Sequence, residues 1–82
     1  MEEIQKYIKD GRIIQMPRKW ESKEKLFIYV ASFFDAGQEY TEKEVNEILK
    51  EHYSDYALLR RYLVDFNLLM RSPDGITYRR VG

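Results

Sequence analysis

Cysteine is absent from this 82-residue chain, and histidine occurs only once. Without cysteine the protein can form neither a disulfide framework nor a thiolate metal site, and its composition suits the reducing cytoplasm. Long apolar runs are also missing: the longest, "LFIYVASFF", is far shorter than the roughly 20 residues of a membrane-spanning helix. The acidic start "MEEIQ" is unlike a signal peptide. We therefore expect a cytoplasmic protein with no membrane contact.

Net charge is a further absence, because 14 basic residues balance 14 acidic ones. This balance argues against strong non-specific binding of nucleic acid, which depends on the neutralisation of phosphate groups. The charges are nevertheless unevenly spread. Glutamates dominate residues 41–54, whereas from Asp55 onward five arginines outnumber three aspartates. The basic character of the C-terminal part therefore comes from arginine alone.

Groups that could perform catalysis are scarce as well. The chain has one histidine and no cysteine, and it contains neither a phosphate-binding loop nor a convincing nucleophile. His52 falls at the end of a predicted helix, on its buried side, and we interpret it as a C-terminal cap rather than as a ligand or base. We expect no enzyme activity, no cofactor and no metal site.

What is present suits one small domain that spans residues 1–82. The chain is 44% hydrophobic and 34% charged, which is too apolar for a disordered protein and too charged for a membrane protein. Residues 1–21 predict a helix and an extended arm. Apolar residues from Ile4 to Ile8 recur at helical spacing, and Gly11 suits the left-handed residue that ends a helix. The segment "RIIQMP" then favours an extended conformation.

Residues 22–82 predict a helical core followed by a hairpin. A broad apolar stripe indicates a buried helix over residues 22–36, and Gly37 follows as a stop. The apolar positions of this stripe are Leu26, Phe27, Tyr29, Val30, Phe33 and Phe34. Thr41 and Glu44 then form a capping box in "TEKE", which predicts the start of a further helix.

A last helix is predicted over about residues 55–66. Ser54 is its expected N-cap, and Asn67 tolerates the left-handed conformation that ends a helix. Residues 68–81, "LLMRSPDGITYRRV", then predict a β-hairpin, because "SPDG" suits a type I turn between two strand-like runs. Tyr40, just before the capping box, is placed to supply a small third strand.

This order of elements predicts a mainly α protein with a small β-hairpin, that is, an α+β winged helix-turn-helix. Residues 1–21 would form the N-terminal helix and arm, and residues 22–82 the helix core and wing. In such a fold the helix over residues 55–66 is the recognition helix, and residues 68–81 form the wing.

Two adjacent arginines stand among the leucines of "ALLRRYLVDF". Helical periodicity places Leu59, Tyr62, Leu63 and Phe66 on the core side and Ala57, Arg60, Arg61 and Val64 on the opposite side. In a helix-turn-helix the outer side enters the major groove, where arginine binds guanine or phosphate. The alternative is an ordinary solvated face, with Arg61 paired to Asp65 and Arg60 lying over Tyr56.

The candidate DNA-contacting residues are Tyr56, Arg60, Arg61, Arg79, Arg80, Arg18 and Lys19. Arg79 and Arg80 alternate across a predicted strand, so only one of them can point away from the sheet. The basic cluster around Trp20 has an alternative interpretation as a charged helix start whose tryptophan covers the core. Asp55 at the helix tip and the apolar Val64 argue against DNA.

Four segments, "GRIIQMP", "EYTEKEVNEIL", "LLRRYLVDF" and "DGITYRR", resemble in order and spacing the bacterial family catalogued as domain of unknown function 2087. Its members are found alone or appended to DNA-binding domains of transcriptional regulators. The resemblance, from Gly11 to Arg80, implies a winged-helix-like fold and a regulatory role, with no catalytic or ligand residues to carry over. The residues that match its "LRR.LVD" motif are Arg60, Arg61, Leu63, Val64 and Asp65. Asn67 stands where the family usually has glycine, and Met70 where it has a charged residue.

Two functions follow from these patterns. The first is a DNA-binding transcriptional regulator, expected to be a homodimer because one recognition helix reads too few base pairs for useful specificity. The alternative is a winged-helix protein-interaction or dimerisation module without direct DNA binding. The C-terminal arginines favour the first function, and the zero net charge favours the second.

Overall fold

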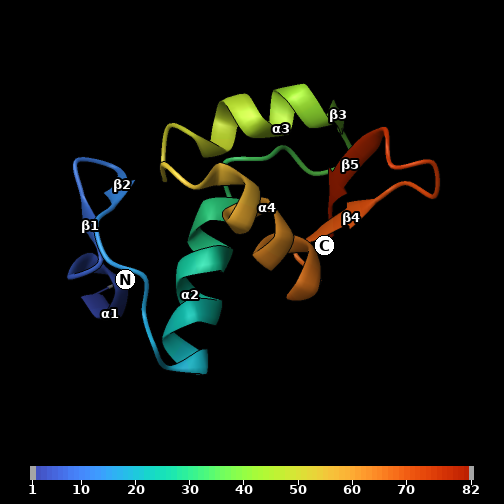
Figure 1. Cartoon of the computed structure of the whole chain (residues 1–82). Coiled ribbons are helices and arrows are strands. Elements are labelled where there is room, and N and C mark those ends of the chain that lie inside the picture. Colours follow the sequence, from blue (N-terminus) through green and yellow to red (C-terminus); the bar gives the residue numbers. More distant parts are fainter. Residues whose placement is uncertain (1, 82) are drawn as a thin grey trace.

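The computed structural model describes residues 2–81 and shows helices joined to a C-terminal hairpin (Figure 1). The elements in chain order are α1 (Glu2–Gln5), β1 (Ile8–Lys9), β2 (Arg12–Ile13), α2 (Trp20–Ala31), β3 (Glu39–Thr41), α3 (Glu42–Leu49), α4 (Tyr56–Asp65), β4 (Leu69–Arg71) and β5 (Thr77–Arg80). The strands form two antiparallel sheets, β1-β2 and β3-β5-β4. The predicted α+β class is therefore confirmed. Within the described residues, no helix has the length and apolar character needed to cross a membrane.

The helix α2 lies between the N-terminal segment and α4 and contacts both (Figure 1). Its Phe27 has no exposed surface. The rings of Phe27 and Tyr62 stack with 5.0 Å between their centroids, and Phe66 meets Phe27 edge-on at 5.0 Å. Because Tyr62 lies in the last turn of α4 and Phe66 is the C-cap that follows it, this aromatic cluster fixes the end of α4 against α2.

The C-terminal boundary of α2 differs from the prediction, since the helix ends at Ala31 and not at residue 36. Phe34 belongs to the same apolar stripe, but it reaches the core from the turn after the helix, with its ring edge-on to Tyr40 at 5.0 Å. Phe33 was also assigned to the stripe, and at 47% exposed it is not a core residue. Apolar periodicity cannot separate the last turn of a helix from the turn that follows it.

The N-terminal segment forms a short helix and a hairpin where the sequence predicted one longer helix. Ile8 lies in β1 and pairs with Ile13 of β2. Between these strands Asp10 and Gly11 have φ angles of 52° and 78°, the positive values that a two-residue hairpin turn requires. Gly11 therefore turns a hairpin instead of ending a helix. Of the extended segment predicted at residues 12–17, only Arg12 and Ile13 form a strand, β2.

This N-terminal hairpin is attached to the end of α3. The guanidinium of Arg12 donates to the carbonyl oxygens of Lys50 and Glu51 at 3.0 and 3.2 Å. His52 is buried, and its Nδ1 lies 2.9 Å from the carbonyl oxygen of Gly11. The capping role that the sequence suggested for the His52 side chain is thus performed by Arg12, whose positive charge suits the C-terminal end of a helix.

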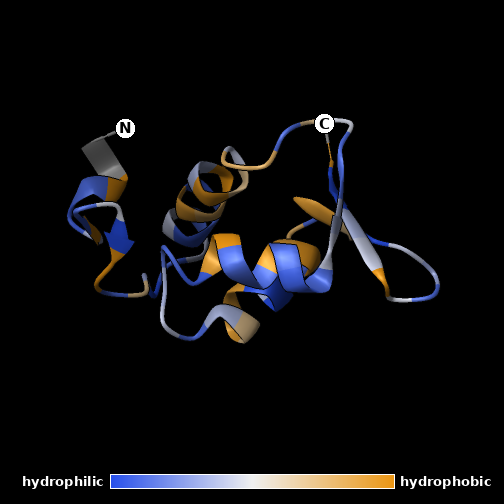
Figure 2. Cartoon of the chain, turned by 90° about the horizontal axis from the view of Figure 1, so that it is seen from above, coloured by the Kyte–Doolittle hydropathy of each residue, from blue (hydrophilic) through white to orange (hydrophobic). Residues whose placement is uncertain are grey.

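The helix α3 begins at the predicted capping box. The backbone N–H of Thr41 donates to Oε1 of Glu44 at 2.8 Å, and Oγ1 of Thr41 accepts from the backbone N–H of Glu44 at 3.1 Å. Val45 and Leu49 have no exposed surface and face the core. The outer side of the helix carries hydrophilic residues, which appear blue in the view from above (Figure 2).

Replacing Thr41 with alanine should lower the free energy of unfolding by about 1 kcal/mol, because the amide of Glu44 loses its hydroxyl acceptor. Chemical denaturation of the two proteins side by side measures the difference. An unchanged denaturation midpoint would show that the hydroxyl contributes nothing at this helix start.

The helix α4 is capped by Asp55, whose Oδ1 accepts from the backbone N–H of Leu58 at 3.2 Å. The prediction of Ser54 as N-cap is wrong by one residue, because both residue types cap helices well and stand side by side here. Leu59 and Leu63 have no exposed surface. The predicted core side of this helix is therefore confirmed.

In the C-terminal sheet, β5 lies between β3 and β4. Tyr78 of β5 pairs with Tyr40 of β3 and with Arg71 of β4. The third strand predicted at Tyr40 is thus confirmed. Asn67, which links α4 to β4, adopts a φ of 60° and so takes the left-handed conformation expected of it.

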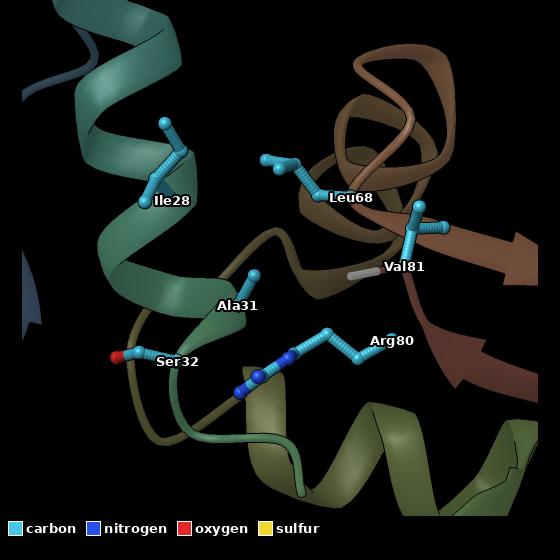
Figure 3. A pocket seen from close by; sticks show the side chains of 6 residues that line it. All are labelled: Ile28, Ala31, Ser32, Leu68, Arg80 and Val81. Carbon is cyan, nitrogen blue, oxygen red and sulfur yellow. The ribbon is translucent and has the colours of Figure 1, made fainter. Parts of the chain in front are cut away.

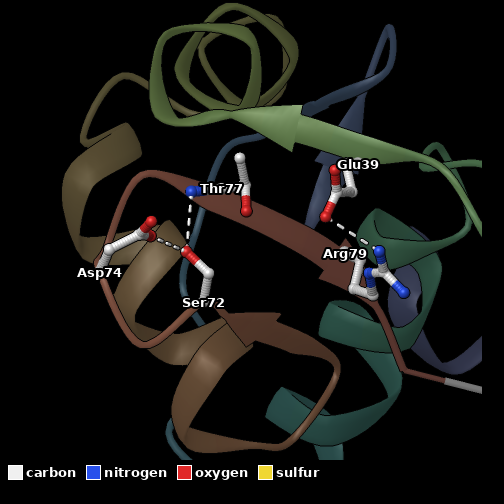
Figure 4. Close-up of polar contacts among 5 residues, drawn as sticks. All are labelled: Glu39, Ser72, Asp74, Thr77 and Arg79. Carbon is white, nitrogen blue, oxygen red and sulfur yellow. Dashed lines mark hydrogen bonds and ion pairs between the residues drawn. The ribbon is translucent and has the colours of Figure 1, made fainter.

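The turn between β4 and β5 is held by side chains as well as by backbone (Figure 4). The N–H of Gly75 donates to the carbonyl oxygen of Ser72 at 2.9 Å, as a β-turn requires. The Ser72 hydroxyl donates to the Asp74 carboxylate and accepts from the N–H of Thr77 at 3.1 Å. The hydrogen bond from Ser72, followed by one from the Ile76 backbone, lowers the pKa of Asp74 below its usual value. Local hydrogen bonds thus order the hairpin tip.

Candidate nucleic-acid interface

A cleft of about 380 Å³ lies between α4 and the C-terminal hairpin, beside the start of α3. Its lining residues are Glu42, Arg60, Arg61, Val64, Asp65, Arg71 and Tyr78. Three of them are arginines, two from α4 and one from β4. We call this feature the arginine cleft.

Arg61 is a highly exposed cation of the arginine cleft. Its side chain is 80% exposed, and its Nε lies 3.8 Å from a carboxylate oxygen of Asp65. The predicted pair between these residues is confirmed. An exposed pair at this distance contributes little to stability, so Arg61 can exchange its partner for another anion at small cost.

Arg60 occupies a different environment from its neighbour. It is half-buried, and its Nη1 donates to Oδ1 of Asn46 on α3. The contact suggested by the sequence was with Tyr56, one helical turn earlier. Because Arg60 spans from α4 to α3, it borders the arginine cleft from the side instead of pointing straight outward.

Arg71 is a cleft residue that the sequence did not single out. It lies in β4, where strand pairing places it opposite Tyr78. Its guanidinium passes over Gly75: a Cβ added to Gly75 would lie 2.6 Å from Nη2 of Arg71. Strand alternation could have indicated this residue in the sequence, because Arg71 and Tyr78 face the same side of the hairpin. Recognising that this side faces α4 required the tertiary structure.

Tyr78 and Glu42 connect the hairpin to α3 at the edge of the cleft. The Tyr78 hydroxyl donates to Oε1 of Glu42 at 2.9 Å. Burial, and then the hydrogen bond and negative charge of Glu42, raise the pKa of Tyr78, while the charges of Arg60 and Arg71 lower it. The hydroxyl that Glu42 binds is thus also influenced by these two arginines, which line the same cleft.

Arg79 lies on the other face of the C-terminal sheet. It pairs in register with Glu39 of β3, and its Nη2 donates to Oε2 of Glu39 at 2.9 Å (Figure 4). Successive strand residues point to opposite faces, so Arg79 faces away from Tyr78 and from the arginine cleft.

Arg80 serves a structural contact. Its Nη1 donates to the carbonyl oxygen of Phe34 at 2.9 Å, which ties β5 to the turn after α2. Its side chain borders an apolar hollow formed with Ile28, Leu68 and Val81 (Figure 3). Arg79 is exposed and Arg80 half-buried, so the structure agrees that only one of the two points away from the sheet.

The remaining candidates lie outside the arginine cleft. Arg18 and Lys19 are exposed and precede α2. The neighbouring Trp20 is 67% exposed and stacks on Phe66 with 4.4 Å between ring centroids. Tyr56 is partly exposed at the first turn of α4. The structure thus brings Arg60 and Arg61 together with Arg71, and leaves the other predicted contacts dispersed.

Acidic and histidine side chains do not gather into a metal site: among the side chains that the structure describes, those of residues 4–81, no group of three or more His, Cys, Asp or Glu could hold a metal ion. The guanidinium groups of the arginine cleft are suited to binding an anion through hydrogen bonds and charge.

Comparison with known proteins identifies a matching family. A family model described as "Uncharacterized protein conserved in bacteria (DUF2087)" matches residues 12–80. The matched region runs from β2 to β5 and includes the entire arginine cleft. No significant match was found among curated proteins or among solved structures.

Proposed function

We propose that this chain, which belongs to the DUF2087 family of bacterial proteins, is a winged-helix domain that binds duplex DNA and acts in transcription regulation. In this proposal α3 and α4 form the helix-turn-helix, α4 is the recognition helix, and β4 and β5 form the wing. The chain order of α3, α4, β4 and β5, with β3 paired to β5, supports this assignment.

The observation that carries the proposal is the convergence of Arg60, Arg61 and Arg71 on one cleft in a chain without net charge. A guanidinium group binds phosphate with two parallel hydrogen bonds. The arginines come from α4 and from the hairpin, which are the two elements that a winged helix lays against DNA. A phosphate in the cleft would therefore be held between recognition helix and wing.

The acidic residues near the cleft set the expected strength of binding. Asp65 already neutralises part of the charge of Arg61, and Asp55 caps the end of α4 that would approach the groove. Both carboxylates repel phosphate. We therefore expect modest affinity for a single domain, and useful specificity only from two copies bound to neighbouring half-sites.

A second candidate function is a protein-interaction module, and the exposed Trp20 favours it. Its ring stacks on Phe66 at 4.4 Å while two thirds of the residue remains accessible. Exposed aromatic residues are enriched in protein interfaces. Under this alternative a protein partner covers Trp20, and the arginine cleft makes no contact with DNA.

Titration with fluorescently labelled duplex DNA of mixed sequence tests the proposal. We expect saturable binding at low salt that weakens as the salt concentration rises, because each neutralised phosphate contributes a slope of about −0.9 to the plot of log affinity against log salt. Absence of binding even at low ionic strength would reject DNA binding. Self-association measured by sedimentation, and lost in Trp20→Ser with the fold intact, would then favour the interaction module.

A further inference from the structure

The feature that extends the proposed function is the carboxylate of Glu42. Glu42 is the first residue of α3, and its Oε1 accepts a hydrogen bond from the hydroxyl of Tyr78, 2.9 Å away on β5. Both residues line the arginine cleft. The chain thus places one of its own anions beside the guanidinium groups that would hold a phosphate.

The two acidic residues of the cleft differ in their partners. Asp65 lies 3.8 Å from Arg61, on the exposed side of α4. Glu42 instead accepts from the neutral hydroxyl of Tyr78, next to which Arg60 and Arg71 are close enough to act electrostatically. Glu42 therefore lies in the same cleft as Arg60 and Arg71, with a neutral hydroxyl as its hydrogen-bond partner.

We infer that Glu42 is an internal competitor of the DNA phosphate, an anion built into the arginine cleft that weakens DNA binding without taking part in it. The inference rests on the proposed function, since it concerns the same cleft. A phosphate that enters the cleft meets the repulsion of this carboxylate at short range, where salt screens it least. Glu42 would thus limit non-specific affinity, so that contacts of α4 with the bases decide where the domain stays bound.

The variant Glu42→Gln tests this inference, with Glu47→Gln as its matched control. Both changes lie on α3 and both raise the net charge from zero to +1. Glutamine keeps an oxygen that can accept from Tyr78. Glu47 lies outside the lining of the cleft, is 56% exposed and pairs with Lys50 at 3.2 Å. The control therefore reports the effect of one positive unit of net charge without a change in the cleft.

At low salt Glu42→Gln should bind mixed-sequence duplex DNA roughly threefold to tenfold more tightly than the wild type, as expected when a like charge is removed a few ångströms from a phosphate. Glu47→Gln should gain less than about twofold, because its exposed charge is screened by salt. Circular dichroism melting verifies that both variants are folded. Tyr78→Phe, which removes the hydroxyl and keeps the carboxylate, should gain no affinity.

Three results would overturn the inference. If the wild type binds DNA and the two glutamine variants gain equally, net charge alone sets the affinity, and only the inference fails. If Tyr78→Phe gains as much DNA affinity as Glu42→Gln, the cause is loss of the hydrogen bond that joins the hairpin to α3, and not loss of the negative charge. If neither the wild type nor Glu42→Gln binds DNA at low salt, the inference fails together with the proposed function. Binding by Glu42→Gln alone would support both.

Discussion

Replacing Leu63 with alanine should lower the free energy of unfolding by about 2 to 5 kcal/mol. Leu63 has no exposed surface and lies on the core side of α4. The substitution removes apolar atoms from the core and leaves a cavity that the surrounding side chains fill only in part. A domain of this size has a total stability of roughly 4 to 12 kcal/mol, so the loss would unfold a measurable fraction of the protein.

Leu58→Ala is the matched control for this prediction, because it makes the same chemical change on the same helix. Leu58 is 37% exposed, so its truncation should cost less than about 1 kcal/mol. Urea denaturation of the three proteins gives both differences. Equal losses of unfolding free energy for the two variants would mean that Leu63 does not face the core. The outward side that we assign to Arg60 and Arg61 on α4 would then be wrong as well.

Replacing Arg60 and Arg61 together with alanine should flatten the plot of log DNA affinity against log salt by about 1.8, the value for two lost phosphate contacts. If one arginine contacts a base instead, the variant should lose about 1 to 3 kcal/mol on its preferred sequence alone. Stability should change by no more than about 1 kcal/mol, because Asn46 loses one hydrogen bond and alanine favours the helix.

The double variant Arg18→Ala with Lys19→Ala removes the same charge from outside the arginine cleft. We expect it to change the slope by less than about 0.9, one phosphate contact. A slope that falls equally in both double variants would indicate a diffuse effect of charge. If the Arg60 and Arg61 variant keeps both the slope and the affinity for the preferred sequence, α4 is not part of the DNA interface. Circular dichroism melting verifies that each variant is folded before its affinity is compared.

The elements predicted correctly from the sequence have signals that lie within a few residues. The capping box of Thr41 and Glu44 acts over a single helical turn, so its residues define the start of α3 by themselves. The same holds for the core side of α4, because helical periodicity and burial agree at Leu59 and Leu63. The left-handed backbone conformation of Asn67 is likewise predicted from the residue type and its place after a helix.

The N-terminal hairpin was missed because two local signals compete there. Ile4 and Ile8 recur at helical spacing, whereas Asp10 and Gly11 favour a two-residue turn between strands. The structure resolves the competition through contacts with a distant element, since Arg12 and the main chain of Gly11 bind residues at the end of α3. The sequence of the N-terminal segment alone does not predict these contacts with the end of α3.

The partners of the cleft residues could not be predicted for the same reason. Arg60 contacts Asn46 on another helix, and Tyr78 reaches Glu42 from a strand that lies 36 residues further along the chain. Such contacts depend on how elements pack, and no spacing rule connects them. The sequence located the arginine pair of α4, but the cleft that includes Arg71 and Glu42 emerges only from the folded chain.

The central claim is that DNA meets the protein at the arginine cleft, and chemical-shift mapping tests it most directly. Amide spectra of the uniformly ¹⁵N-labelled protein would be recorded during titration with duplex DNA at low salt. The account predicts that the largest shifts fall in α4 and in the hairpin of β4 and β5, with Arg61 and Arg71 among them. Shifts centred on Trp20 and the outer side of α2, or no shifts at all, would contradict it.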